Sequence, residues 1–467
     1  MQKDDINAVL EWVDAERPAA IDRLCEFLRI PSVSADPAQK AEVARAAEWA
    51  CHQLRAAGLN AAVRPAKGHP MVVARHEGPP GYDGPTLLYY GHYDVQPPDP
   101  IELWNSGPFD PVVVDGPRGP RIVARGAVDD KGQVMSFIEA FRGWNKVHGT
   151  LPCPVTVLLE GEEESGSESL EPFLEANRDE LRADACVVSD TGMWDVATPA
   201  ITTSLRGLVY LEVTVHGPDK DLHSGMYGGA VPNPVQVLAG IITQLHDANR
   251  RITVPGFYDG VPDVPARVLD QWRAMGFDES EFLGSIGLSH GYGESGRSLL
   301  ERTWSRPTCD VNGIFGGYTG KGAKTVIASH ATAKLSFRLV GSQDPQRISK
   351  SVREFFESRL PAGCTATFTE HGLSPAFVVP DASPILAAAE RALQRVYGKP
   401  PLLIGSGGSI PAVGALQRIV GVPALLMGFG LDDDCVHSPN EKFEVACFVG
   451  AIRSHAALLG EVGRMRR

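Results

Sequence analysis

The feature that most constrains this chain is a set of short apolar runs that each end in a loop bearing His or carboxylate side chains. Four such runs are residues 86–89, 155–159, 185–188 and 423–427, which lead in turn to His92 and Asp94, to Glu162 through Glu164, to Asp190 and to His437. In open α/β sheets, ligand sites form outside the carboxyl ends of the strands. We therefore expect these side chains to meet at one rim, together with the segment Asp129-Asp130-Lys131-Gly132 that precedes a helical stretch.

Taken singly, each of these features has an ordinary explanation. A His after a strand is usually a hydrogen-bonded loop residue, and an acidic run such as Glu162 to Glu164 is usually a solvated face. Together these features indicate a metal site, because consecutive carboxylates beside an apolar strand repel one another unless cations compensate their charge. Two His with three carboxylates form a ligand set suited to Zn²⁺ or Mn²⁺.

The length of 467 residues predicts two domains, because one ordinary core rarely grows so large. Helical patterns over 5–28 and 38–57 are followed by alternating strand and helix signals to about residue 203, as a mainly parallel α/β sheet requires. Strand-like alternation at 209–215 and 333–339, with helical stretches at 234–247 and 346–359, indicates an α+β insert. We expect a metal-binding catalytic domain over 1–204 and 376–467, interrupted by a second domain over 205–375.

Charge and hydropathy limit the partners of the chain. A net charge of −13 argues against nucleic acid, because phosphate binding needs a Lys/Arg stripe. No continuous apolar run approaches the roughly 18 residues that a membrane span needs, so we expect no membrane partner. The first residues lack the basic and apolar segments of a signal peptide, and the expected location is the cytoplasm.

The motifs also resemble a known family over nearly the whole chain. Five segments, 91–94, 129–132, 163–166, 189–190 and 437–441, resemble in order and spacing those of the M20 di-metal peptidases. Two more, Asp221 to Gly225 and Gly407 to Pro411, are similar to those of the carnosinase-like dipeptidase subgroup of this family. The resemblance implies an α/β catalytic domain interrupted by a lid domain, which usually forms a homodimer.

The resemblance also implies a set of metal ligands. His92 and His437 would each bind one of two divalent ions, Asp129 would bridge both ions, and Glu164 and Asp190 would complete the two sets. The ions would be Zn²⁺, which we favour, or Mn²⁺. The family pattern further has a cis peptide after the bridging Asp.

Three further residues gain catalytic roles. By resemblance, Glu163 is the general base for a hydroxide that bridges the metals. Asp94 follows His92 by two residues, so both lie on one side of an extended segment, where the carboxylate can hold the second imidazole nitrogen. His223 resembles the His that reaches from the partner subunit to stabilise the oxyanion; an ordinary exposed loop His is the alternative.

Arg338 lies mid-strand among apolar residues, where an unpaired guanidinium is costly, so it must meet an anion. The anion is either a structural carboxylate or, by resemblance, the free C-terminal carboxylate of a peptide. Thr325, Gly408 and Ser409 would assist in binding it. The expected substrate is thus a dipeptide whose amide bond is hydrolysed.

One departure from the family pattern concerns specificity. Carnosinase-like enzymes usually carry Arg-Glu where this chain has Gly405-Ser406. The departure leaves bacterial-type dipeptidases and relatives that cleave N-acyl amino acids as competitors to a carnosinase. The alternative function is that of an N-acyl-amino-acid deacylase or a carboxypeptidase. A non-catalytic peptide-binding protein is a more remote one.

Overall fold

The computed structural model describes residues 6–380, 382–408 and 410–466, and the chain folds into two units. The first unit comprises Met1–Thr203, Val379–Leu403 and Ala415–Arg467; the second comprises Ser204–Val378 and Ile404–Gly414. Along the chain, Ser204–Val378 of the second unit thus lies between two segments of the first. The segment Ile404–Gly414, which the sequence assigned to the catalytic domain, groups instead with the inserted unit.

The first unit is built on a large sheet in the strand order β1-β2-β6-β3-β7-β17-β8. These strands are β1 (Asn60–Arg64), β2 (Met71–His76), β6 (Val155–Glu160), β3 (Leu87–His92), β7 (Ala185–Val188), β17 (Ala424–Leu426) and β8 (Ala200–Leu205). The four central strands β6, β3, β7 and β17 run parallel, whereas β1, β2 and β8 join through antiparallel pairings. The predicted α/β class with a parallel sheet is confirmed, with antiparallel strands at its flanks.

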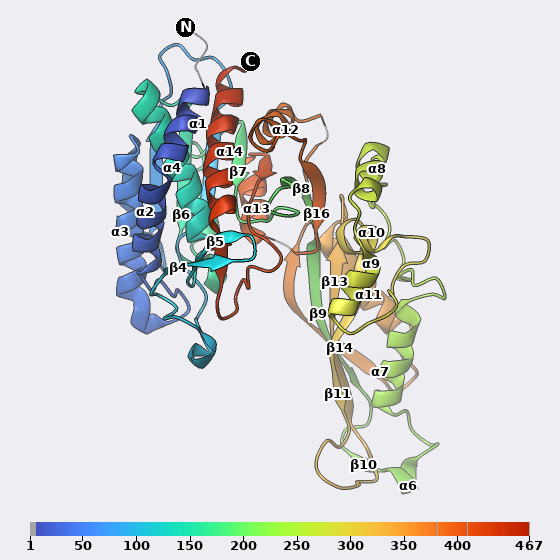
Figure 1. Cartoon of the computed structure of the whole chain (residues 1–467). Helices are drawn as coiled ribbons and strands as arrows, with labels where there is room; N and C mark the ends of the chain where they lie inside the picture. Colours follow the sequence, from blue (N-terminus) through green and yellow to red (C-terminus); the bar gives the residue numbers. More distant parts are fainter. Residues whose placement is uncertain (1–5, 381, 409, 467) are drawn as a thin grey trace. The chain divides into compact units, whose positions relative to one another are not determined.

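Every residue of the central strands is buried, as expected for strands that are covered on both faces. The helices of this unit are α1 (Ile6–Ala15), α2 (Arg17–Leu28), α3 (Lys40–Ala56), α4 (Lys131–His148), α5 (Leu170–Ala176), α12 (Pro384–Tyr397) and α14 (Val445–Gly463). Helix α14 is long and apolar enough to cross a membrane by length and composition, but 83% of its apolar window is buried. It packs beside α1, α4 and α12 in the core of the unit (Figure 1).

The N-terminal helix differs from its prediction. Instead of one helix over 5–28, the chain forms α1 and α2 with a break at Glu16. Pro18 explains the break, because proline lacks an N–H and is tolerated only in the first turn of a helix, where α2 places it. The second predicted helix is α3, preceded by a single 3₁₀ turn at Pro37–Gln39.

A small three-stranded sheet holds the segment that precedes α4. It consists of β4 (Val112–Gly116), β5 (Gly119–Val123) and β18 (Lys442–Glu444), with β5 in the middle. Lys442 pairs with Val123, and the Ala124 N–H donates to the main-chain oxygen of Glu441. The C-terminal segment thereby lies against the loop that carries Asp129.

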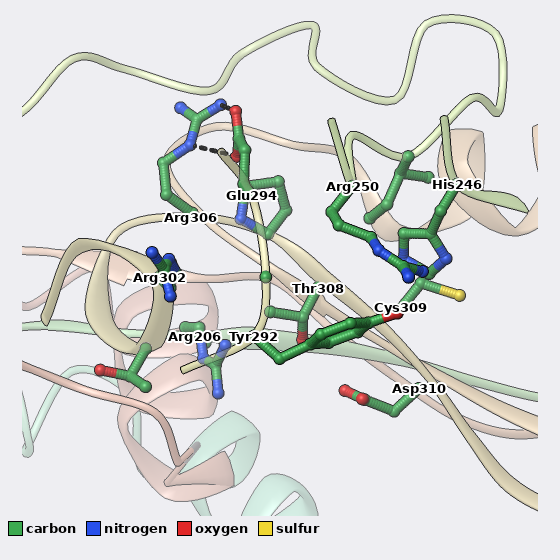
Figure 2. A pocket seen from close by; sticks show the side chains of 14 residues that line it. Arg206, His246, Arg250, Tyr292, Glu294, Arg302, Arg306, Thr308, Cys309 and Asp310 are labelled. Carbon is green, nitrogen blue, oxygen red and sulfur yellow. Dashed lines mark hydrogen bonds and ion pairs between the residues drawn. The ribbon is translucent and has the colours of Figure 1, made fainter. Parts of the chain in front are cut away.

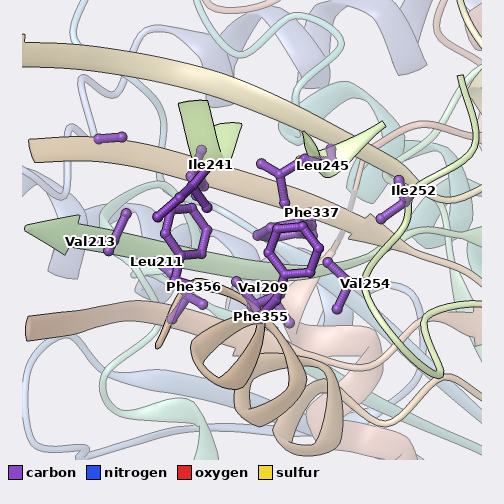
Figure 3. Packing of buried hydrophobic residues seen from close by; sticks show 14 of the residues in the cluster. Val209, Leu211, Val213, Ile241, Leu245, Ile252, Val254, Phe337, Phe355 and Phe356 are labelled. Carbon is purple, nitrogen blue, oxygen red and sulfur yellow. The ribbon is translucent and has the colours of Figure 1, made fainter. Parts of the chain in front are cut away.

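The second unit contains a four-stranded antiparallel sheet in the order β11-β13-β9-β14. Its strands are β11 (Thr308–Gly316), β13 (His330–Leu339), β9 (Gly207–His216) and β14 (Thr365–Ser374). Buried and half-buried side chains alternate along β9, so every second side chain enters an apolar cluster. The cluster also contains Phe337 of β13 and Phe355 and Phe356 of α11 (Pro345–Glu357) (Figure 3). Helix α7 (Pro234–Ile242) packs against the same sheet and contributes Ile241.

The second unit also has shorter elements. They are α6 (Ser224–Tyr227), α8 (Ala266–Ala274), α9 (Glu279–Ser285), α10 (Leu299–Trp304), β10 (Leu222–His223), β12 (Val326–Ile327) and β15 (Phe377–Val378). Two more elements, β16 (Leu402–Ser406) and α13 (Pro411–Ala415), begin in one unit and end in the other. Strands β10 and β12 pair with each other as a separate ribbon.

Candidate metal centre

Three adjacent parallel strands of the first unit deliver acidic and His side chains to one edge of the sheet. His92 ends β3 and pairs in register with Glu160, which ends β6. Asp190 follows β7, the neighbour of β3 on the other side. Glu163 and Glu164 lie in a 3₁₀ turn just after β6. The fold thus places these side chains together at the ends of the strands, where the sequence predicts them.

Two further ligand candidates come from loops. Asp129 lies between β5 and α4, and the peptide bond between Asp129 and Asp130 is cis, as the family resemblance implied. His437 lies in the loop after β17 and adopts a left-handed backbone, with φ of 59°. Residues other than glycine seldom adopt this conformation, which is concentrated at functional sites.

The two carboxylate oxygens of Asp129 each face a different imidazole. Oδ1 lies 3.1 Å from Nε2 of His92, and Oδ2 lies 2.9 Å from Nε2 of His437. The same His437 nitrogen lies 3.2 Å from Oε2 of Glu164. Asp129 therefore stands between two clusters of side chains.

The two clusters have the composition of a pair of metal sites. One contains His92, Asp129 and Asp190, the other Asp129, Glu164 and His437, and within each the candidate ligand atoms lie within 4.8 Å of one another. His92 is fully buried, and among the described residues its Nε2 has no hydrogen-bond partner of good geometry. Imidazole and carboxylate ligands in this mixture suit Zn²⁺ and Mn²⁺, so the residues present fit two divalent ions with Asp129 shared.

Electrostatics explain why cations would be bound here. Hydrogen bonding to Asp129 and Glu164 raises the pKa of His437 to about 10, and burial raises the pKa of Asp190 to about 7. Burial opposes protonation of His92, yet Asp129 and Asp94 raise its pKa well above the ordinary value. The excess negative charge thus attracts protons, and divalent cations would displace them because ligands bind metal in their deprotonated form.

Asp94 connects two of the candidate ligands. The Nδ1–H of His92 donates to the main-chain oxygen of Asp94 at 3.1 Å, with the Asp94 carboxylate 3.3 Å away. The other carboxylate oxygen of Asp94 accepts a hydrogen bond from the backbone N–H of Glu164 at 3.1 Å. With the proton on Nδ1, the Nε2 of neutral His92 keeps its lone pair free for a cation. The sequence assigned this contact to the carboxylate alone; the main-chain oxygen shares it.

Glu163 lies in an environment that favours its protonated form. Burial raises its pKa above the ordinary value, and the negative charges of Glu164 and Asp129 add to the effect, although His92 opposes it. A raised carboxylate pKa brings a general base closer to the pH at which it must both accept and release a proton.

Two supporting residues were missed in the sequence. The side-chain amide of Gln96 donates to Oε2 of Glu164 at 2.8 Å. The buried Glu441 carboxylate accepts hydrogen bonds from the backbone of the loop that carries Asp129. Gln96 has no sequence signature, because it acts through a contact that only the fold creates. Glu441 ends the segment 437–441 that carries the family resemblance, but no role was assigned to it.

The second unit brings together His223, which was expected to be catalytic, and Thr325, which was expected to bind substrate. His223 on β10 lies beside β12, and its Nε2 is 3.4 Å from Oγ1 of Thr325. The Nδ1 of His223 accepts a hydrogen bond from the Gly225 N–H at 3.1 Å. The proton of the neutral imidazole is therefore on Nε2, where it can be donated to an oxygen.

Arg338 lies elsewhere in the second unit, on β13. Its neighbours Phe337 and Leu339 enter the apolar cluster, so Arg338 points to the opposite face of the sheet. Within the described ranges no carboxylate forms an ion pair with it, so the structural partner considered from the sequence is not found. The main-chain oxygen of Gly408 accepts from the Arg206 N–H at 3.1 Å, and Ser409 lies outside the described residues.

Comparison with known proteins identifies the relatives of this chain. Residues 88–461 match the model of peptidase family M20/M25/M40. The Cys-Gly metallodipeptidase of Schizosaccharomyces pombe is 29% identical over 98% of this chain and 99% of its own length. The human Beta-Ala-His dipeptidase is 30% identical over 99% of this chain and 91% of its own length.

A solved structure extends the likeness to the fold. The M20 family metallo-carboxypeptidase Sso-CP2 from Sulfolobus solfataricus has a TM-score of 0.79 and 31% identity, covering 95% of this chain and 99% of its own. These matches confirm the resemblance inferred from the five segments, and with it the prediction that the protein is a metal-dependent enzyme.

Proposed function

Because the chain belongs to peptidase family M20/M25/M40, we propose that it is a di-metal dipeptidase that hydrolyses dipeptides with a free C-terminal carboxylate. The observation that carries the proposal is the position of Asp129, whose two oxygens face His92 and His437 at 3.1 and 2.9 Å. The relatives from fission yeast and human, which match over nearly the whole chain, are both named as dipeptidases.

In this proposal the five side chains of the two clusters hold the ions. His92 and Asp190 serve one ion, His437 and Glu164 the other, and Asp129 both. Two divalent ions bound there would lower the pKa of a water molecule and polarise the carbonyl of the scissile amide. We favour Zn²⁺ over Mn²⁺, as in the prediction from the sequence.

Glu163 would move the protons. It would take a proton from the attacking water and pass it to the leaving amine, which needs the raised pKa that burial gives this carboxylate. Asp94 would hold the Nδ1 proton of His92, and Gln96 would orient Glu164 through the amide contact at 2.8 Å. These contacts keep the ligand atoms in one arrangement.

The second unit would supply the substrate contacts. Arg338, with no carboxylate partner among the described residues, is suited to bind the free carboxylate of the substrate. His223, with its proton on Nε2 and Thr325 beside it, would donate to the developing oxyanion from a partner subunit of a homodimer. The dimer and the cytoplasmic location are further parts of the proposal.

A carboxypeptidase is the second candidate. It is favoured by the likeness to Sso-CP2, a metallo-carboxypeptidase that is 31% identical to this chain with a TM-score of 0.79. Gly405 separates the chain from carnosinase-like enzymes, because the Arg usual there is absent and a Cβ at this position would lie 2.6 Å from Cβ of Trp304. Deacylation of N-acyl amino acids would need the same carboxylate contact.

The test strips the protein with chelator, restores Zn²⁺ or Mn²⁺, and measures hydrolysis of Ala-Ala, Ala-Ala amide, N-acetyl-alanine and Ala-Ala-Ala. A dipeptidase cleaves Ala-Ala in a metal-dependent way and leaves the amide largely intact. Faster release of alanine from the tripeptide would favour the carboxypeptidase, and cleavage of N-acetyl-alanine alone would favour the deacylase. Equal cleavage of Ala-Ala and its amide would contradict the carboxylate contact.

A further inference from the structure

The second unit contains a cavity of about 330 Å³ that is rich in arginine. We call it the arginine pocket and define it by six of its lining residues, which Figure 2 shows around one opening: Arg206, His246, Arg250, Tyr292, Arg302 and Arg306. Arg206 lies just before β9, and His246, Arg250 and Tyr292 lie in loops. Arg302 is on α10, and Arg306 lies between α10 and β11. None of them belongs to the proposed metal centre.

The charges of the pocket are not balanced. Arg306 forms a bidentate ion pair with Glu294, in which Nε and Nη2 each lie 2.8 Å from a carboxylate oxygen. Nη1 of Arg251 donates to the same carboxylate at 2.9 Å. Glu294 is therefore already shared by two guanidinium groups. The other carboxylate in the lining is that of Asp310, which is exposed.

Three guanidinium groups are left without an ion pair in the part of the chain that the structure describes: those of Arg206, Arg250 and Arg302. Two of the three groups are nevertheless held in place. The Nε–H of Arg206 donates to the main-chain oxygen of Gly407 at 3.1 Å, and Arg250 stacks on the Tyr292 ring at 4.1 Å. The Nε of Arg302 is buried and has no hydrogen-bond partner among the described residues.

Such an arrangement has an energetic cost in the absence of an anion. Burial, together with the nearby charge of Arg338, lowers the pKa of Arg206 to about 10, although the carboxylate of Asp310 opposes the shift. A buried donor without a hydrogen-bond partner destabilises the fold, and more so when it is charged. The chain carries a net charge of −13, so a local concentration of cations is not a consequence of its composition.

We propose that the arginine pocket binds a small anionic molecule through a carboxylate or phosphate group, held by Arg206, Arg250 and Arg302. The planar guanidinium fork matches both kinds of oxyanion with two parallel hydrogen bonds. A volume of about 330 Å³ is at the lower end of the range for small-molecule pockets, which run from about 300 to 1,000 Å³. The Tyr292 ring and Ile252 provide apolar surface for the carbon skeleton of the ligand.

The test is calorimetric titration of the full-length protein with glutarate and with inorganic phosphate, in a buffer of low ionic strength without other multivalent anions. The titrations are repeated after chelator treatment, so that binding to divalent ions is not mistaken for binding at the pocket. The wild type is expected to bind at least one of the two probes in both conditions. Tighter binding of glutarate indicates a carboxylate ligand, and tighter binding of phosphate indicates a phosphorylated one.

Variants locate the binding. Arg302→Met and Arg250→Leu are each expected to weaken it at least tenfold. Arg273→Met, an exposed arginine that pairs with Asp270 on α8 of the same unit, is expected to leave it unchanged. Arg250 lies on an exposed loop, so its variant decides the result if Arg302→Met does not fold.

The proposal is overturned if the wild type binds neither probe, or if the Arg250 variant binds as tightly as wild type. Because the readout is binding and needs no turnover, a protein that fails to cleave dipeptides can still pass this test. An active dipeptidase can equally fail it.

Discussion

The carboxylate of Glu441 accepts a hydrogen bond from the backbone N–H of Asp129 at 3.1 Å. The same carboxylate accepts from the backbone N–H groups of Val128 and Gly126, both at 3.0 Å, and forms an ion pair with buried Arg125 at 2.6 Å. One side chain from the C-terminal segment thus fixes the loop whose Asp129 faces both imidazoles. The loop must keep one conformation if Asp129 is to serve as a ligand to two ions at once.

Replacing this carboxylate tests whether the loop controls metal binding. Glu441→Gln loses charge-assisted hydrogen bonds to the loop and leaves Arg125 without its ion pair. Loss of such a supporting contact typically weakens metal affinity about 10- to 100-fold. Titration of the metal-free protein with Zn²⁺ measures the effect, with exposed Glu171→Gln as the matched control. Unchanged affinity would remove Glu441 from this role.

Glu163→Gln separates proton transfer from metal binding. The variant should keep the divalent ions, since Glu163 belongs to neither cluster, but lose at least about two decades of kcat, as removal of a general base predicts. Metal content by mass spectrometry and dipeptide turnover are measured on the same sample. Glu168→Gln, which is in the same loop but exposed, serves as the control and should keep wild-type activity. Wild-type turnover by Glu163→Gln would exclude it as the base.

Arg338→Met tests the carboxylate contact. The KM for a free dipeptide should rise by at least about tenfold, as expected for loss of a charge-assisted pair worth about 1.5–3 kcal/mol, while the low rate on the dipeptide amide stays the same. Arg353→Met, at a partly exposed position that pairs with Glu370 in the same unit, is the matched control. A parallel loss on acid and amide would assign Arg338 to the stability of the fold.

His455 makes the stability of the first unit depend on pH. Burial lowers the pKa of this imidazole to about 3, and its Nε2 lies 2.9 Å from Oγ of Ser189. Between about pH 3 and the ordinary value of about 6.5, the unfolded chain binds a proton here that the folded protein does not. The free energy of unfolding therefore falls as the pH falls through this range, by up to about 1.4 kcal/mol per pH unit.

His455→Gln retains a hydrogen-bonding group near Ser189 but cannot take up the proton. Urea unfolding of both proteins at pH 7 and pH 5 gives the difference in pH dependence. The variant should lose less stability than wild type over this interval, whatever its stability at pH 7. Equal losses would show that His455 does not titrate as its buried position implies.

The strand ends could be predicted from the sequence because apolar runs followed by acidic loops have few alternatives in a parallel sheet. That reasoning placed His92, Glu164 and Asp190 at one rim, where the structure has them. The shared role of Asp129 came from family resemblance, since nothing in its local sequence indicates which residues it faces. Gln96 could not have been predicted, because its function depends on a contact across the fold.

Other features depended on details that periodicity does not report. The break between α1 and α2 follows from Pro18, whose effect outweighs an otherwise helical pattern. The arginine pocket combines residues from 206 to 310, and its unbalanced charge emerges only when Glu294 is seen to be shared by Arg251 and Arg306.

The central claim is that five side chains hold two divalent ions with Asp129 between them, and the number of ions bound per chain tests it most directly. Metal-free protein is titrated with Zn²⁺ in a calorimeter, in parallel with Asp129→Ala. We expect two equivalents for the wild type and loss of tight binding at both sites in the variant, because Asp129 belongs to both clusters. A single equivalent in the wild type, or two tight equivalents in Asp129→Ala, would contradict the claim.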